Sequence, residues 1–193
     1  MDNKFDNESV MATLFGMILL LIAFLYLGEN MKLPQIWLIQ LCSLIVVVIA
    51  AIYGSVVGVM IPFTAYLILH MVLAGNPSVD SIVYLVILGL GTGHYKDKFM
   101  VGVGKFFGIR ITDYIVVEGV LVMLVWICIY PLCMFYFQSE DIRVTIFQGL
   151  KYFGIALVNV ICISIPLLLL LNTVYKKRQD EIDARNEYMG NIR

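Results

Sequence analysis

The sequence predicts an all-α integral membrane protein, a bundle of six transmembrane helices whose N and C termini are both cytoplasmic. Of the 193 residues, 61% are hydrophobic and 14% are charged, whereas soluble domains contain about 45–50% apolar and about 25% charged residues. The mean hydropathy is +0.93. A spanning helix needs roughly 20 apolar residues to cross about 30 Å of hydrocarbon, so the chain accommodates about six such helices and no separate soluble domain.

The first two spans are expected at about residues 10–28 and 36–52, on either side of a short polar loop that contains Pro34. Within the first span, Ala12 and Gly16 form a pair of small residues four positions apart. Such a pair lets a second helix approach closely. It is compatible both with packing inside the bundle and with a surface for a partner protein.

The third span lies within residues 51–77 and contains Pro62, Tyr66 and His70, which a lipid-facing helix disfavours. We therefore expect this helix to be packed inside the bundle or to line a cavity. About three residues, 53–55, separate it from the second span, so the two helices are expected to be antiparallel neighbours. A turn at residues 74–77 follows and is expected to face outside, because it carries no Lys or Arg.

The fourth span, at about residues 82–95, contains the sequence GLGTG at positions 89–93. Glycine-rich loops that hold phosphate connect a strand to a helix. Because both flanks of this segment are membrane helix, we expect the glycines to serve close helix packing. The next loop contains four basic residues and three phenylalanines, Phe99, Phe106 and Phe107. These aromatic rings are expected on the membrane surface or against a cytoplasmic partner.

The fifth and sixth spans are expected at about residues 111–137 and 144–175. Glu118 lies within the fifth, where an unpaired charge costs on the order of a few kcal/mol, so its side chain should point into the bundle. We expect the transmembrane domain to comprise residues 1–178 and residues 179–193 to form a cytoplasmic tail.

The distribution of basic residues sets the predicted topology. Seven lie in the loop between the fourth and fifth spans and at the start of the tail, whereas the opposite loops contain Lys32 and Arg143. The positive-inside rule places the seven on the cytoplasmic side. No basic run suits nucleic acid. The four cysteines lie in apolar segments without C-x-x-C spacing, which favours buried thiols over disulfides or a zinc site; they are Cys42, Cys128, Cys133 and Cys162.

Several segments together resemble the substrate-binding S components of energy-coupling factor (ECF) transporters, in particular the riboflavin-type and uncharacterised members. They are IYGSVVGVMIPF at 52–63, AGNP at 74–77, YPLCMFYFQSEDIRVTIFQGL at 130–150 and VNVICISIPLLLLL at 158–171, together with the Lys-bearing loop. The resemblance implies a six-helix subunit of the bacterial cytoplasmic membrane that binds a vitamin or related micronutrient in an outward-facing pocket.

The resemblance also implies partners. An S component associates with the transmembrane coupling protein EcfT and two cytoplasmic ATPases, and a small-residue motif in its first helix contacts EcfT. The nearest match in this chain is Ala12 with Gly16. The sequence has no phosphate-binding loop of the form G-x-x-x-x-G-K-[ST], so a transporter of this kind needs an external motor. We expect no enzymatic activity, cofactor or metal.

An outward-facing pocket draws its lining from the outer halves of the third to sixth spans, where aromatic walls and a few polar groups suit a small molecule. The candidate residues are His70, Met71, Tyr84, Trp126, Tyr130, Lys151, Tyr152 and Asn159. Simpler roles stay open for some of them. Tyr130 and Tyr152 also fit an interfacial aromatic belt, Lys151 fits a snorkelling lysine, and His70 fits a packing residue.

Trp126 and the tyrosines suit a flat vitamin such as a flavin or a thiamine precursor, whereas His70 and Met71 suit haem or another tetrapyrrole. A non-transport scaffold protein of the membrane is an alternative to both. An intramembrane cysteine peptidase is disfavoured, because His70 has no cysteine within a helical turn or two; such an enzyme needs nucleophile and base in contact.

Overall fold

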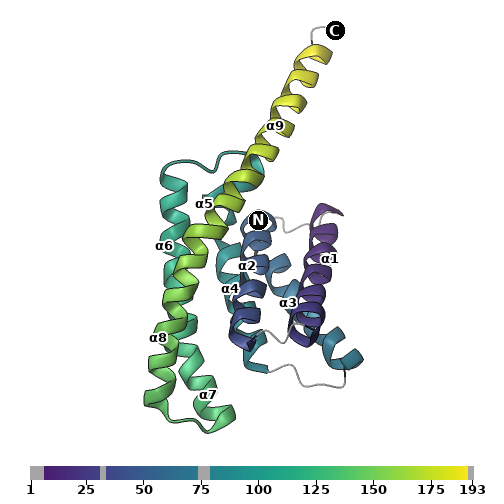
Figure 1. Cartoon of the computed structure of the whole chain (residues 1–193). Helices are drawn as coiled ribbons and strands as arrows, with labels where there is room; N and C mark the ends of the chain where they lie inside the picture. Colours follow the sequence, from purple (N-terminus) through teal and green to yellow (C-terminus); the bar gives the residue numbers. More distant parts are fainter. Residues whose placement is uncertain (1–6, 31–33, 74–78, 191–193) are drawn as a thin grey trace.

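In a computed structural model, residues 7–30, 34–73 and 79–190 are described, and their regular elements are all helical (Figure 1). Four helices are long and apolar enough to cross a membrane, at 7–27, 36–53, 109–136 and 142–185. Two shorter apolar helices occupy 55–71 and 81–94. The chain is therefore built as a membrane protein, while six crossings and cytoplasmic termini stay predictions.

The N-terminal half forms a first helix group. It comprises α1 (Asn7–Ile22), which continues as the π-helical stretch η1 (Ala23–Asn30), α2 (Gln35–Tyr53), α3 (Ser55–Leu73) and α4 (Val79–His94). The break between α2 and α3 is Gly54, whose φ of 99° favours glycine. The two helices pack against each other, which confirms them as neighbours. The turn expected at residues 74–77 lies outside the described residues.

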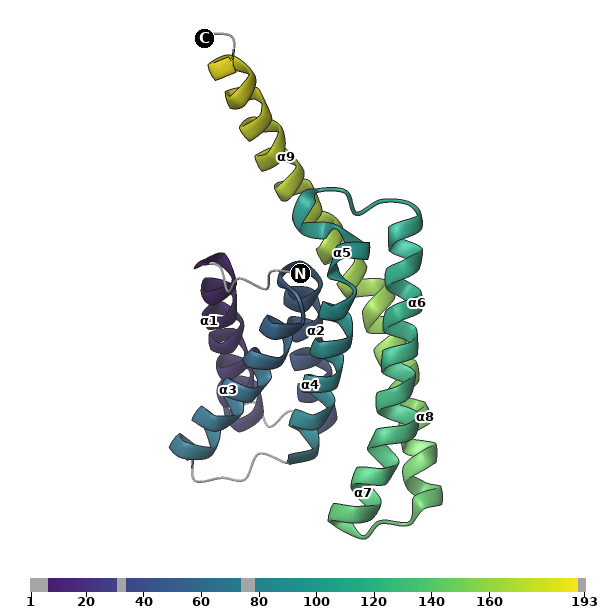
Figure 2. The ribbon, with the colours of Figure 1, turned by 180° about the vertical axis from the view of Figure 1, so that it is seen from behind.

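The C-terminal half forms a second helix group of two long rods that lie side by side (Figures 1 and 2). The first rod joins α6 (Ile109–Met123), η3 (Leu124–Ile129) and α7 (Tyr130–Gln138), and the second joins α8 (Ile142–Asn159), η4 (Val160–Ser164) and α9 (Ile165–Gly190). Asp141 caps α8 by accepting a hydrogen bond of 2.8 Å from the Arg143 N–H. The described part of the expected tail continues α9 as helix and projects beyond the bundle.

The segment between the two groups is folded onto the bundle. It contains α5 (Lys96–Phe99) and a 3-10 turn, η2 (Val101–Val103). Phe99 and Phe106 are fully buried and meet the Tyr114 ring edge to face, at centroid distances of 5.1 and 5.8 Å. The expectation of surface phenylalanines is therefore wrong for these two, because α6 supplies an aromatic partner. Phe107 alone of the three is half exposed.

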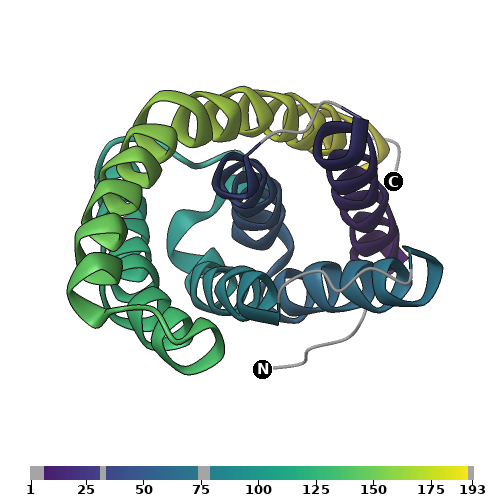
Figure 3. The same cartoon turned by 60° about the horizontal axis from the view of Figure 1, so that its bottom comes forward.

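Helix α2 is encircled by other helices in the view of Figure 3, and it packs against α3 and α4 of its own group and against α8 of the second group. Helix α4 also contacts both groups, and it does so with separate faces. Leu85, Gly89 and Gly93 recur every four residues on one face, which packs toward α3. Tyr84, Leu88 and Thr92 recur in the same way on the face toward α6 and η3.

The glycines of GLGTG serve close helix packing, as the sequence predicts. A Cβ placed on Gly89 would lie 2.2 Å from the Gly58 carbonyl oxygen, and one on Gly93 would lie 2.2 Å from the Ser55 nitrogen. The backbones of α3 and α4 are therefore in direct contact, and any larger side chain at these glycines would prevent this close approach.

Replacement of Gly89 by Ala should lower the free energy of unfolding by about 1–3 kcal/mol, because the added methyl group forces two backbones apart. Unfolding of the purified protein in detergent, followed by circular dichroism, measures the change. Gly154→Ala is the matched control, since a Cβ there meets nothing within 4 Å, and it should leave stability unchanged or raised by up to about 1 kcal/mol. Equal stability of the two variants would contradict the described contact.

Candidate functional site

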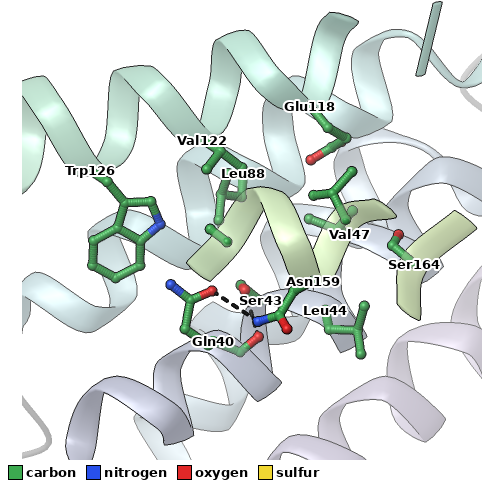
Figure 4. Close-up of a pocket in the computed structure, with 12 residues that line it drawn as sticks. Gln40, Ser43, Leu44, Val47, Leu88, Glu118, Val122, Trp126, Asn159 and Ser164 are labelled. Carbon is green, nitrogen blue, oxygen red and sulfur yellow. Dashed lines mark hydrogen bonds between the residues drawn. The ribbon is translucent and has the colours of Figure 1, made fainter. Parts of the chain in front are cut away.

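A small cavity lies between the two helix groups, with walls from α2, α4, the α6–η3 rod and the α8–η4 rod (Figure 4). Its lining residues are Gln40, Ser43, Leu44, Val47, Leu88, Glu118, Val122, Trp126, Ala156, Asn159, Val160 and Ser164. The cavity volume is about 20 Å³, enough for about one water molecule. Five polar side chains, those of Gln40, Ser43, Glu118, Asn159 and Ser164, are thus gathered around one cavity.

Helical spacing explains why these side chains meet. In α2, positions 40, 43, 44 and 47 follow the i, i+3, i+4, i+7 pattern of one helix face. In the α6–η3 rod, Glu118, Val122 and Trp126 recur every four residues and line the cavity in a row (Figure 4). The sequence therefore directs one polar-containing stripe of each helix to the same space.

Two amide side chains cross the interface between the helix groups. Asn159 Nδ2 donates to Gln40 Oε1 at 3.5 Å, drawn as the dashed line in Figure 4, and Gln40 Nε2 donates to the Tyr152 carbonyl oxygen at 3.4 Å. Protein N–H···O hydrogen bonds are usually 2.7–3.2 Å long. The two bonds that Gln40 makes across the interface are therefore long and weak.

Glu118 is fully buried, and Thr92 of α4 is its partner. Thr92 Oγ1 lies 2.8 Å from the Leu88 carbonyl oxygen and 2.5 Å from Glu118 Oε1. In the described part of the chain, Glu118 Oε2 has no hydrogen-bond partner. A buried acceptor without a partner costs about 1–3 kcal/mol. A bound molecule that donates a hydrogen bond to Glu118 Oε2 would therefore recover this cost.

An aromatic cluster of Tyr84, Trp126, Tyr130 and Tyr152 borders the cavity. The Trp126 ring centroid is 5.5 Å from that of Tyr84 and 5.6 Å from that of Tyr152, and the Tyr130 and Tyr152 centroids are 5.4 Å apart. The Tyr130 hydroxyl donates to Gln148 Oε1 at 2.9 Å. The rings come from α4, η3, α7 and α8, so they join the two helix groups beside the cavity.

The structure brings together five of the eight residues that the sequence suggests for a pocket. Trp126 and Asn159 line the cavity, while Tyr84, Tyr130 and Tyr152 pack around Trp126. The other three lie elsewhere. His70 is exposed and stacks on Tyr66 with a centroid distance of 5.9 Å, Met71 is 79% exposed, and Lys151 is exposed on α8.

Sequence reasoning missed Gln40, Ser43 and Ser164 as members of the site. Each is a polar residue within an apolar helix, and Gln40 and Ser164 are buried. A buried amide in a spanning helix is unusual enough to indicate a function or a specific partner. That signal was present in the sequence, where Gln40 is surrounded by apolar residues.

The two residues of the proposed partner-binding pair, Ala12 and Gly16, have different surroundings on α1. A Cβ on Gly16 would lie 2.5 Å from Ile61 Cδ1 and 2.8 Å from Ile49 Cδ1, so Gly16 allows α1 to pack against α2 and α3. Ala12 instead lines a groove of about 530 Å³ with residues of α1, α2 and α9. Contact of either residue with a partner protein stays a prediction.

Within the described residues, no three His, Cys, Asp or Glu side chains are grouped so that they could hold a metal ion. The four cysteines are free. The buried polar groups are therefore the chemical content of the cavity, and they can donate and accept hydrogen bonds to a small molecule or to water.

Thr92→Val should lower the free energy of unfolding by about 1–3 kcal/mol, because it leaves the buried Glu118 carboxyl without its partner. In a Glu118→Leu background the same substitution should cost at least about 0.5 kcal/mol less, which is the coupling energy expected of residues in contact. Denaturant titration in detergent measures the cycle. Thr92→Ser keeps the hydroxyl and should retain the coupling, whereas additive effects of Thr92→Val and Glu118→Leu would contradict the bond.

Comparisons of the chain with known protein families, with curated proteins and with solved structures find no match. The assignment of a function consequently depends on the residues of the cavity and of the helix groups that form it.

Proposed function

We propose that this chain is the substrate-binding subunit of an ECF-type importer of the bacterial cytoplasmic membrane, which captures a vitamin or related micronutrient from outside. The observation that supports this most is the cavity, where an aromatic ring and a carboxyl group from the α6–η3 rod converge with two amides from α2 and α8. Convergent polar groups beside an aromatic wall are typical of small-molecule sites.

Binding of a vitamin requires the cavity to expand, because ligand sites have volumes of about 300–1,000 Å³. The packing indicates where expansion is easiest. The α3 and α4 backbones are in contact at Gly58 and Gly89, whereas the bonds that Gln40 makes between the two groups are 3.4–3.5 Å long. A short bond between the groups, from Thr92 to Glu118, lies near the C-terminal end of α4. We propose that the groups separate as rigid units.

Shorter bonds near the α9 end favour a hinge there. The Tyr53 and Tyr175 hydroxyl groups are 2.8 Å apart and join α2 to α9, and Asn172 Oδ1 accepts a 2.7 Å bond from the Phe106 N–H. We therefore propose that the opposite end, where α7 meets α8, opens to admit the substrate. Under the predicted topology this end faces outside.

The proposed partners are EcfT and two ATPases. The groove on α1 supports this part of the proposal, because it combines Ala12 with exposed apolar side chains such as Met11 and Phe15. The Glu8–Arg178 ion pair of 3.2 Å lies at the same groove. A helix of a membrane partner fits such an apolar groove between helices.

Two alternatives differ in their support. Haem or another tetrapyrrole has little support as the substrate, since His70 and Met71 are exposed side chains of α3. A scaffold protein without a ligand is the second candidate, and the small volume of the cavity, about 20 Å³, favours it.

Substrate binding should change the fluorescence of Trp126. The chain has two tryptophans, of which Trp126 is 1% exposed and lines the cavity, while Trp37 is 52% exposed on α2. A Trp37→Phe protein therefore reports on the cavity alone. Titration with a panel of vitamins should give a saturable change at one ligand per chain.

The reciprocal Trp126→Phe protein is the control, and its remaining Trp37 signal should not respond to the same ligand. A panel that leaves both proteins unchanged, together with an empty protein after purification from rich medium, would favour the scaffold candidate over the importer.

Ala12→Trp should abolish co-purification with EcfT and the ATPases from the same cells, because the ring fills the α1 groove. Because the added tryptophan also fluoresces, ligand binding by this variant is measured by calorimetry, and it should persist. Val116→Trp, on a 58% exposed position of α6, adds the same bulk away from the groove and should retain the partners. Loss of partners in the Val116 variant alone would place the contact on the second helix group.

A further inference from the structure

We infer that the substrate is an uncharged or cationic nitrogen heterocycle that donates an N–H group to Glu118 and carries no carboxylate or phosphate. This inference rests on the proposed function and names the substrate class for the same site. It follows from the charges that line the cavity, from the unpaired oxygen of Glu118 and from the position of Trp126.

The lining of the cavity offers no counter-charge to an anion. Among the described residues that form it, none is Lys, Arg or His, and the ionisable one is Glu118. The two basic candidates that the sequence suggested, His70 and Lys151, are exposed and do not line it. An anionic group buried here would be unpaired and beside a carboxyl group, an arrangement that costs several kcal/mol.

The Glu118 carboxyl offers an acceptor in either of two charge states. If Thr92 donates its single proton to the Leu88 carbonyl oxygen, Glu118 Oε1 must carry the shared proton, and Oε2 is then a carbonyl-type acceptor. If the carboxyl group is ionised, both of its oxygens accept. In each case Oε2, which lacks a partner in the described chain, matches an N–H of the ligand, and a cation matches the ionised form best.

Trp126 supplies the second point of recognition. It lies eight residues after Glu118 on the same rod, which corresponds to a separation of about 12 Å along the axis at 1.5 Å per residue. Both side chains line the cavity, one at each end of the row in Figure 4. A molecule of one or two rings can therefore place an amino group at Glu118 and a flat ring against the indole, where cations and aromatic rings both bind favourably.

The amides of Gln40 and Asn159 line the same cavity and are compatible with the same class of ligand. Each amide provides donors and an acceptor, and their bond to each other, at 3.5 Å, is long enough to be exchanged for bonds to a ligand. Ring nitrogens and exocyclic amino groups present the complementary pattern.

The test compares pairs of compounds that differ by one anionic group. Calorimetric titration of the purified full-length protein uses thiamine against thiamine monophosphate, pyridoxamine against pyridoxamine 5′-phosphate, and riboflavin against riboflavin 5′-phosphate, with biotin and haem as carboxylates. We expect the binding compound to be the unphosphorylated member of its pair, with its phosphate binding at least about 100-fold more weakly.

Glu118→Leu should weaken binding of that compound by about 10- to 100-fold, since it removes both carboxyl oxygens and leaves the N–H group of the ligand without an acceptor. Unchanged affinity in this variant would overturn the inference. Asp113→Leu is the matched control. It removes a carboxyl group five residues earlier on α6, outside the cavity lining, and should leave the affinity unchanged. Circular dichroism of both variants verifies that they fold.

Tight binding of a phosphorylated or carboxylated compound would overturn the inference and leave the proposed function intact. Equal loss of affinity in the Glu118 and Asp113 variants would also overturn it, because the effect would then be general. Absence of binding by every compound, with no small molecule extracted from the protein purified from rich medium, would overturn the proposed function and the inference with it.

Discussion

Direct backbone contact between α3 and α4 is the constraint on which the arrangement of the other helices depends. Gly58 and Gly89 allow this contact, because a Cβ on Gly89 would lie 2.2 Å from the Gly58 oxygen. Once α4 is fixed against α3, its opposite face presents Tyr84, Leu88 and Thr92 to the second helix group. Close packing through small residues, which is the usual basis of helix association in lipid, thus determines where the polar groups of the cavity meet.

The polar groups introduce a second constraint, since each must find a partner in a medium without water. Thr92 satisfies one oxygen of Glu118, and Gln40 and Asn159 satisfy each other through a long bond. The first helix group is held by backbone contact, whereas the interface at the cavity combines the short Thr92–Glu118 bond with the long bonds of Gln40. Stability is therefore distributed unevenly, and the interface is weakest at Gln40.

Hydropathy predicted the positions of the helices well, because the thickness of a bilayer determines how many apolar residues a span contains. The glycines at 89–93 also predicted close packing. Of the eight residues predicted for a pocket, Trp126 and Asn159 line the cavity, and three tyrosines pack around Trp126. The sequence did not predict that Gln40 lines the cavity, that His70 faces outward, or that Phe99 and Phe106 are buried against Tyr114. Composition gives the depth of a residue in the membrane, whereas the direction of its side chain depends on which helix packs against that face.

The unpaired oxygen of Glu118 bears on the choice between a binding protein and a scaffold. A scaffold gains stability from apolar packing, and a leucine at position 118 would remove the cost of a buried acceptor. In a binding protein, a ligand that donates a hydrogen bond to Oε2 removes the cost of the unpaired oxygen. The free energy recovered in this way contributes to affinity and favours ligands that carry a donor. The same reasoning applies to the long bond between Gln40 and Asn159, which a ligand can replace by shorter ones. The unpaired oxygen of Glu118 and the long amide bond thus both favour the binding of a ligand that donates and accepts hydrogen bonds.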